Sequence, residues 1–222
     1  MKSGRTRNLK QYSEIYTSGK RYGEGSWRMA DGIHVIIDAL VRFEGLDRKF
    51  TVLDFGCGRS PLIETLDEKI QKTHPNHQIS FFRYDPAILD FSICPVDECD
   101  MVINTDVLEH LDENEISLIL EDIRGIAPRA FFAISTRPAS TQLPSGENAH
   151  ATVKEGDWWM ARINEYFPHV SKISQEQDSI LILATAKKVI DTEKIAADFR
   201  AAIVRSKPFH KRLGIKLKQL LQ

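Results

Sequence analysis

Residues that could do chemistry gather in the segment TVLDFGCGRSP at positions 51–61. Its first half is apolar and β-branched, as in a buried strand, and Gly56 and Gly58 lie where the chain turns toward Pro61, a residue suited to the first turn of a helix. A strand that ends in glycines and enters a helix offers backbone N–H groups and a positive helix end to a ligand. The segment therefore predicts a site for a nucleotide-like cofactor.

The acid Asp54 restricts the kind of cofactor. A dinucleotide fingerprint needs a small residue at the sixth position of Gly56-Cys-Gly-Arg-Ser-Pro61, where proline stands. A carboxylate two residues before the first glycine would repel a pyrophosphate, but it suits a ligand with an ammonium group and no phosphate. S-adenosylmethionine is such a ligand. Asp85, at the end of the next predicted strand, either accepts hydrogen bonds from ribose hydroxyls or forms a turn before proline.

An alternation of strands and helices positions these residues. Apolar periodicity predicts helices over residues 12–18, 33–41, 61–72, 113–126 and 157–167, and strands over residues 50–55, 79–84, 101–104, 130–135, 170–174 and 180–186. Strand, helix and strand in succession imply parallel pairing, so we expect an α/β fold with a doubly wound, Rossmann-like sheet. The last two strands, joined by a turn at residues 175–178, should form an antiparallel hairpin.

Three motifs together resemble the class I S-adenosylmethionine-dependent methyltransferases. They are VLDFGCG at 52–58, YDP at 84–86 and DMVINTDVLEHL at 100–111, and the resemblance covers about residues 30–187. It implies S-adenosylmethionine as the cofactor. It assigns the contacts to this cofactor to Asp54, Gly56, Gly58, Asp85, Pro86, Asn104 and Asp106.

Within that assignment, Asp54 and the glycines would lie along the methionine part, Asp85 would hold the ribose and Pro86 would pack on adenine. Asn104 and Asp106 would face the sulfonium and its methyl group, although polar residues there equally suit the cap of the following helix.

The sequence departs from the family pattern at two places. Ser60 stands where the last glycine is usual. Only residues 87–99 separate the second strand from the next, too few for the usual helix, strand and adenine-binding acid, so we predict a third unit shortened to little more than residues 91–94. Asp97 and Ile88 are the candidate substitutes for the adenine contact.

A histidine is the expected general base, because its pKa lies near the working pH. The candidates are His150 and His110, with His34 on the early helix a third. We prefer His150, since the loop 138–156 follows a strand whose carboxyl end faces the predicted cofactor site. Asn148 shares that loop and is expected to bind the acceptor. His110 could equally be a hydrogen-bonded structural residue.

Other residues are candidates for the acceptor pocket. Arg137 could bind an acceptor carboxylate or phosphate, or form a surface ion pair. Trp158 could wall the pocket together with Trp27 and Tyr22, or pack in the core. The sequence lacks the Asn/Asp-Pro-Pro-Tyr/Phe segment of amino-methylating relatives. The expected target is therefore an oxygen of a small metabolite or saccharide.

Composition excludes several classes of protein. The formal charge is −1, hydrophobic residues are 42% and charged residues 27%, which is typical of a soluble globular protein and gives no bulk attraction to nucleic acid. Cys57, Cys94 and Cys99 form neither a disulfide framework nor a zinc pattern, so we expect no metal and a reducing, cytoplasmic location. No segment resembles a signal peptide or a membrane span.

The last residues differ from the rest of the chain. We expect a methyltransferase domain at 1–190 with N-terminal helices, and a basic amphipathic helical tail at 191–222. Residues 205–222 contain no acid. Their pattern suits a membrane surface, nucleic acid or a protein partner, or packing on the chain's own domain or on a second copy. A nucleic-acid methyltransferase and a non-catalytic scaffold with this fold are the alternative functions.

Overall fold

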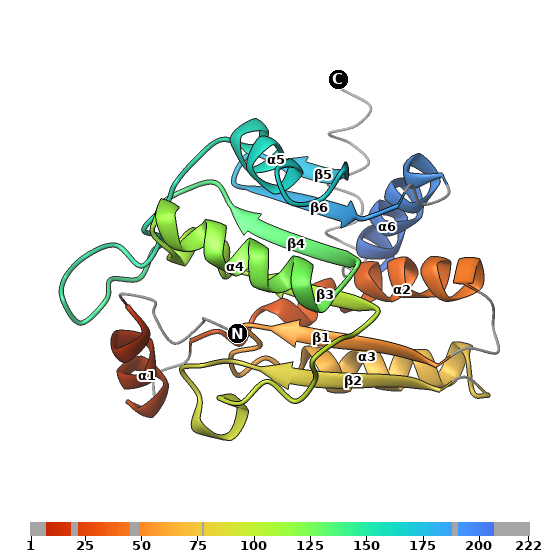
Figure 1. Cartoon of the computed structure of the whole chain (residues 1–222), viewed down its shortest axis with the longest axis horizontal. Coiled ribbons are helices and arrows are strands. Elements are labelled where there is room, and N and C mark those ends of the chain that lie inside the picture. Colours follow the sequence, from red (N-terminus) through yellow and green to blue (C-terminus); the bar gives the residue numbers. More distant parts are fainter. Residues whose placement is uncertain (1–7, 19–21, 45–48, 77, 188–190, 207–222) are drawn as a thin grey trace.

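The computed structural model describes residues 8–18, 22–44, 49–76, 78–187 and 191–206 (Figure 1). The helices are α1 (Leu9–Thr17), α2 (Ala30–Glu44), α3 (Leu62–Thr73), α4 (Glu113–Ile126), α5 (Gly156–Asn164) and α6 (Thr192–Ser206), with short 3₁₀ helices η2 (Ser26–Met29), η3 (Leu89–Phe91) and η4 (Leu108–His110). The strands are β1 (Phe50–Phe55), β2 (Ile79–Tyr84), β3 (Met101–Thr105), β4 (Arg129–Ser135), β5 (His169–Glu176) and β6 (Ser179–Thr185).

The strands form one sheet in the order β2-β1-β3-β4-β6-β5. The first four are parallel, whereas β6 runs antiparallel to both β4 and β5. The prediction of a doubly wound sheet that ends in a hairpin is confirmed. Several boundaries differ from the prediction by one to three residues, among them those of β5 and α5. Strand β5 continues to Glu176, which leaves only residues 177–178 as the turn, and α5 ends at Asn164 because Pro168 follows closely and cannot continue a helix.

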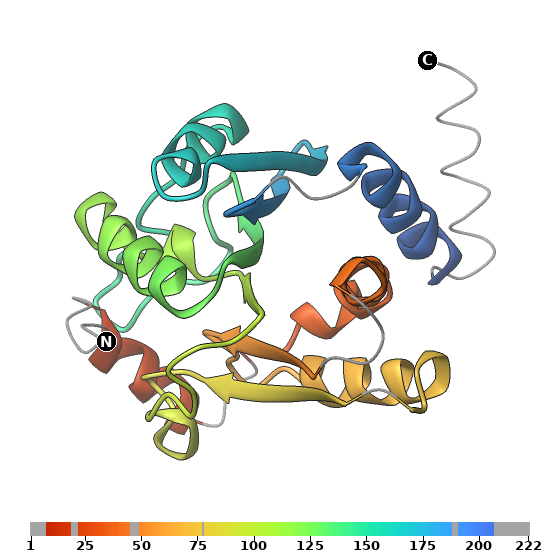
Figure 2. The same ribbon diagram turned by 45° about the vertical axis from the view of Figure 1, so that its right-hand side comes forward.

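Helices cover both faces of the sheet, with α2, α3 and α6 on one side and α4 and α5 on the other (Figure 2). Successive strand residues alternate between these layers. Val52 packs in the cluster with α2 and α3, and its neighbour Leu53 packs in the cluster with α4. A parallel sheet buried on both faces needs such continuous apolar strands. The carboxyl ends of the parallel strands β1 to β4 are thereby held at one edge by a packed core.

The third strand-helix unit is shortened, as expected. Between β2 and β3 the regular structure is the single turn η3, which lies at Leu89–Phe91 rather than at residues 91–94. Strand β2 consequently stands at an end of the sheet. Leu89 and Ile93 are 89% and 84% exposed, because no helix of a third unit covers them.

Helix α6, which begins the predicted tail, packs on the domain core. The ring of Phe199 lies so close to Gly32 of α2 that a Cβ there would come within 2.3 Å of it. Arg200 Nη1 donates to the carbonyl oxygen of Ile173 at 2.7 Å. The basic residues 207–222 lie outside the described part of the chain. In that described part, each helix is too short or too polar to cross a lipid bilayer.

Candidate functional site

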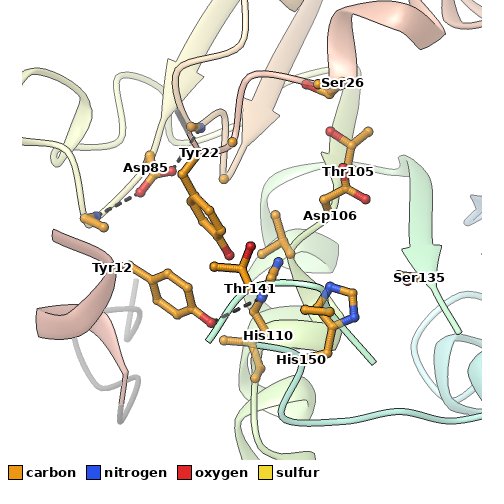
Figure 3. Close-up of a pocket in the computed structure, with 18 of the residues that line it drawn as sticks. Tyr12, Tyr22, Ser26, Asp85, Thr105, Asp106, His110, Ser135, Thr141 and His150 are labelled. Carbon is orange, nitrogen blue, oxygen red and sulfur yellow. Dashed lines mark hydrogen bonds between the residues drawn. The ribbon is translucent and has the colours of Figure 1, made fainter. Parts of the chain in front are cut away.

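A cavity of about 380 Å³ opens at the carboxyl ends of the parallel strands (Figure 3). Its lining comes from the segments that follow β1, β2, β3 and β4, and from α1 and residues 22–26. In the strand order the chain direction of the connections reverses between β1 and β3, which is where open α/β sheets bind their ligands. The cavity therefore has the position expected of a functional site.

The loop after β1 is built for close approach to a ligand. Gly56 and Gly58 have φ angles of 83° and 53°, in the left-handed region that favours glycine. A Cβ at Gly56 would lie 2.4 Å from Val107 Cγ2, and one at Gly58 would lie 2.9 Å from the Gly23 oxygen. Glycine is therefore required on steric grounds at both positions, and both line the cavity.

Ser60, the departure from the family pattern, has a structural role. It is buried, and its Oγ accepts a hydrogen bond from the Trp27 backbone N–H at 3.1 Å. The serine hydroxyl thus fastens η2 to the loop after β1. Serine in place of the usual glycine therefore holds the loop after β1 in position.

Asp85 joins the end of β2 to the glycine loop. Its Oδ2 accepts from Gly58 N at 3.0 Å and its Oδ1 accepts from Ala87 N at 2.9 Å. Burial raises the pKa of this carboxyl group, and the two amides oppose that shift. Each oxygen keeps a further lone pair toward the cavity, which Asp85 and Pro86 both line.

Asp54 and Asn104 lie buried behind the loop and do not line the cavity. Both carboxylate oxygens of Asp54 and the amide oxygen of Asn104 have no hydrogen-bond partner in the described part of the protein. Burial raises the Asp54 pKa to about 7, although Arg83 opposes this. Asn104 Nδ2 donates to the Phe55 oxygen at 2.9 Å and so ties β3 to the end of β1. Buried acceptors without partners suit a cationic or hydrogen-donating ligand beside them.

Asp106 follows β3 and lines the cavity. Its φ angle of 55° is strained for a residue other than glycine, and its N–H donates to the Ala133 oxygen at 2.9 Å. Such strain is typical of functional positions. Burial raises the Asp106 pKa, and the nearby His150 opposes the shift. The carboxyl group of Asp106 and the imidazole of His150 are therefore close enough to interact electrostatically.

The ring of His150 is oriented by one hydrogen bond. Its Nδ1 lies 2.6 Å from the backbone oxygen of Arg137. A carbonyl oxygen can only accept, so Nδ1 carries the hydrogen and the neutral ring has its lone pair on Nε2. The ring lines the cavity and meets the ring of His110 edge to face, with centroids 4.8 Å apart. This tautomer is the one that a general base requires.

His110 is held more tightly. Its Nδ1 lies 2.8 Å from the Ala149 oxygen and, by the same argument, donates to it. Tyr12 Oη donates to the same carbonyl at 3.0 Å and lies 3.2 Å from His110 Nδ1 (Figure 3). Burial lowers the His110 pKa to about 4. His110 therefore stays neutral at working pH and fastens the loop that carries Ala149.

The other predicted acceptor residues lie at the edge of the cavity or outside it. Arg137 lines the cavity mouth, is 64% exposed and lies 3.6 Å from Asp178. Asn148 turns away from the cavity: its Nδ2 donates to the Ala139 oxygen and its Oδ1 accepts from the N–H groups of Ala139 and His150. Trp158 also lies outside the lining, where it packs on Trp159.

Sequence reasoning missed two tyrosines of α1. Tyr12 and Tyr16 line the cavity, as does Tyr22, which was expected there; Trp27 is instead 44% exposed. The spacing of Tyr12 and Tyr16, four residues apart on one helix face, was the available signal. Tyr22 Oη is buried with no hydrogen-bond partner in the described residues. Among those same residues, no group of three or more His, Cys, Asp and Glu side chains could hold a metal ion.

Comparison with known proteins identifies the fold. No protein-family model and no curated protein matches the sequence. An O-methyltransferase family protein from Burkholderia thailandensis has a similar structure, with 14% identity and a TM-score of 0.52 over 84% of this chain; this chain spans 66% of that protein, just under two thirds. The chain therefore has the fold of the class I S-adenosylmethionine-dependent methyltransferases, as its motifs indicated.

Two further structures are more distant. One is a 1,6-didemethyltoxoflavin N1-methyltransferase from B. thailandensis with bound S-adenosylhomocysteine, at 13% identity and a TM-score of 0.49, covering 81% of this chain and 87% of that one. The other is the magnesium protoporphyrin IX methyltransferase of Synechocystis PCC 6803 with bound S-adenosylhomocysteine, at 17% identity and a TM-score of 0.39, covering 80% and 93%.

Proposed function

We propose that this protein is an S-adenosylmethionine-dependent methyltransferase that methylates an oxygen atom of a small metabolite or saccharide. The observation that carries the proposal is the meeting of two features in one cavity. A glycine loop with Asp85 lines one side, and the imidazole of His150, with Nε2 free to accept a proton, lines the other. A methyl donor and a hydroxyl acceptor would need these two features together.

The residues present fit the cofactor. Gly56, Gly58, Asp85 and Pro86 would hold it, and the unpartnered buried oxygens of Asp54 provide the negative potential that an ammonium group requires. When bound, S-adenosylmethionine supplies a methyl group already activated by a sulfonium, so the protein has to position the acceptor oxygen and remove its proton.

His150 is the residue that would remove the proton. The Arg137 carbonyl fixes the ring orientation through Nδ1, which leaves Nε2 to accept the hydrogen of the acceptor hydroxyl. Asp106 lies in the same lining and stabilises the imidazolium that results. His110 fits this role less well, because its low pKa makes it a weak base.

The acceptor side is mostly uncharged. Tyr12 and Tyr22 contribute ring faces, and the side chains of Ser135 and Thr141 lie in the same lining. These groups suit a small, uncharged, hydroxyl-bearing acceptor, and the buried hydroxyl of Tyr22 has no hydrogen-bond partner among the described residues. Arg137 at the rim would bind an acidic substituent where the acceptor has one.

We place the protein in the cytoplasm, with residues 205–222 as a contact to a membrane surface or to a protein of a membrane-bound glycan-assembly system. The support is the absence of acids in that segment. Co-sedimentation with vesicles containing anionic lipid, for the full chain and a chain ending at residue 204, tests it. Equal sedimentation of the two would contradict the membrane contact.

Calorimetric titration with S-adenosylmethionine and S-adenosylhomocysteine tests the function. We expect a dissociation constant in the micromolar range, about −8 kcal/mol. Asp85→Asn should weaken it about tenfold or more, because a charged hydrogen-bond acceptor is lost. The matched control is Asp90→Asn, on the exposed turn η3 that follows Asp85. A folded wild-type protein that binds neither ligand would contradict the proposal, and labelled methyl transfer to candidate hydroxyl acceptors follows if both bind.

A further inference from the structure

Glu109 is a fully buried acid in η4, outside the cofactor cradle and outside the cavity lining. Its Oε1 accepts from Ser135 N at 2.7 Å, and its backbone oxygen accepts from Thr152 N at 3.0 Å. Ser135 ends β4, and Thr152 follows the acceptor loop, which we define as residues 136–150. The two ends of the acceptor loop are thus attached to one residue.

The acceptor loop behaves as one unit between these attachments. Ala149 N donates to the Thr141 oxygen at 3.0 Å, and Asn148 joins the two sides through its contacts with Ala139 and His150. His150 itself is bonded to the Arg137 oxygen near the start of the loop. A shift at the Ser135 end would therefore be passed to the imidazole ring of His150.

The surroundings of Glu109 disfavour a negative charge. Its Oε2 is buried with no hydrogen-bond partner among the described residues. The ionisable groups that act on it are Asp106 after β3, Tyr12 of α1 and Tyr22, which are all acids. Burial, with Asp106 next, raises the Glu109 pKa to about 8, and backbone hydrogen bonds from Ser135, Glu109 and Val107 oppose the shift. The buried site therefore favours the protonated carboxyl group.

We propose that Glu109 is a positioning residue, which holds the acceptor loop through its bonds to Ser135 and Thr152 and so sets His150 against the acceptor hydroxyl. The effect of Glu109 on catalysis rests on the proposed methyltransferase function. A neutral Glu109 adds no negative charge beside Asp106, whose carboxyl group lies near the imidazolium that His150 forms on taking a proton. Ionisation of Glu109 would add a second negative charge next to Asp106, although the bond from Ser135 N favours the ionised form.

The test compares Glu109→Ala, Glu109→Gln and wild type. Glutamine keeps an oxygen that can accept from Ser135 N and is always neutral, whereas alanine removes that acceptor. Glu115→Gln is the matched control, because Glu115 is a buried acid six residues further along the chain whose carboxylate accepts from Asp112 N. Single-residue hydrogen exchange at the Ser135 amide is the readout, with S-adenosylhomocysteine affinity measured in parallel.

In Glu109→Ala the Ser135 amide should exchange roughly tenfold faster or more, as expected on loss of a buried hydrogen bond. At pH 7 Glu109→Gln and the control should match wild type. Between pH 7 and 9, after correction for intrinsic exchange, wild type should gain protection at Ser135 as Glu109 ionises, because a carboxylate is the stronger acceptor, while Glu109→Gln should not change. If Glu109→Ala does not fold, the comparison of wild type with Glu109→Gln tests the proposal by itself.

Wild-type protection at Ser135 in Glu109→Ala, or the same change of protection with pH in wild type and Glu109→Gln, would overturn the proposal. With an acceptor in hand, Glu109→Ala should lower kcat at an unchanged KM for S-adenosylmethionine, and Glu109→Gln should restore kcat at neutral pH. Failure of wild type to bind S-adenosylhomocysteine would contradict the methyltransferase function and leave the exchange result standing, so the two failures are distinguishable.

Discussion

The two sides of the cavity are made in different ways. The cofactor side uses backbone: Gly56, Gly58 and the amides bonded to Asp85 come from two short segments that follow neighbouring strands. The acceptor side uses side chains brought together from α1, η4 and the acceptor loop, as in the shared bond of Tyr12 and His110 to Ala149. We infer that local sequence determines the first side and tertiary contacts determine the second.

The largest expected effect belongs to the acceptor side. His150→Ala should lower the rate of methyl transfer to an identified acceptor by about 10²- to 10⁴-fold, because a general base is lost. S-adenosylmethionine affinity should stay unchanged if the two sides are independent. His169→Ala, at the far end of the sheet, is the control. An unaltered rate in His150→Ala would remove this residue from the mechanism.

On the cofactor side, Gly56→Ala should abolish measurable cofactor binding at ordinary concentrations and destabilise the fold by about 2 kcal/mol or more, because the new Cβ meets Val107 at an unfavourable φ. Gly146→Ala is the control that separates backbone strain from steric crowding. Its φ angle is also positive, at 86°, but a Cβ there would meet no atom within 4 Å. Calorimetric titration and denaturant unfolding check both variants. Equal cofactor affinities in the two variants would show that crowding at Gly56 is unimportant.

The buried acid behind the glycine loop gives a pH-dependent prediction. The Asp54 pKa in the folded state, about 7, lies above its unfolded value, so the folded protein binds more protons and its stability falls as pH rises through 7. From pH 6 to 8 the Asp54 contribution should decrease by about 1 kcal/mol. Denaturant unfolding of Asp54→Asn and wild type, without cofactor and at several pH values, measures this contribution. The difference between their free energies of unfolding should change with pH, and a constant difference would contradict the raised pKa of Asp54.

The smallest effect is expected at the contact between α1 and the acceptor loop. Tyr12→Phe removes the hydroxyl that donates to Ala149 and should raise the acceptor KM a few-fold, about 1 kcal/mol. Cofactor affinity should not change. Tyr166→Phe, on the α5 side of the molecule, serves as the control for loss of a phenol hydroxyl. If Tyr12→Phe weakened cofactor binding more than acceptor binding, the two sides of the cavity would not be independent.

Much of the fold could be predicted because its signals are local. The limits of β1, β2 and α4 coincide with the predicted ranges, since apolar periodicity and turn residues depend on near neighbours. The glycine loop and Asp85 were found for the same reason. Asn148 was expected to bind an acceptor, but its amide closes the loop on Ala139, a contact nine residues away that no spacing rule indicates.

Other parts of the site depend on distant contacts. Glu109 reaches Ser135, and Tyr12 reaches Ala149, 137 residues later. The side-chain direction of Trp158 depends on which face of α5 meets the sheet: its neighbour Trp159 is fully buried, and Trp158 lies beside Lys154. The sequence motifs identify the family pattern, but they do not contain these pairings.

The attachment of α1 has a kinetic consequence. Tyr16 of α1 lies against Gly58 on the cofactor side, and Tyr12 and Gln11 bond to the acceptor loop through Ala149 and Ser145. A movement of this helix that uncovers one product also uncovers the other. Under the proposed function, release of the methylated product and of S-adenosylhomocysteine would therefore share a single opening step.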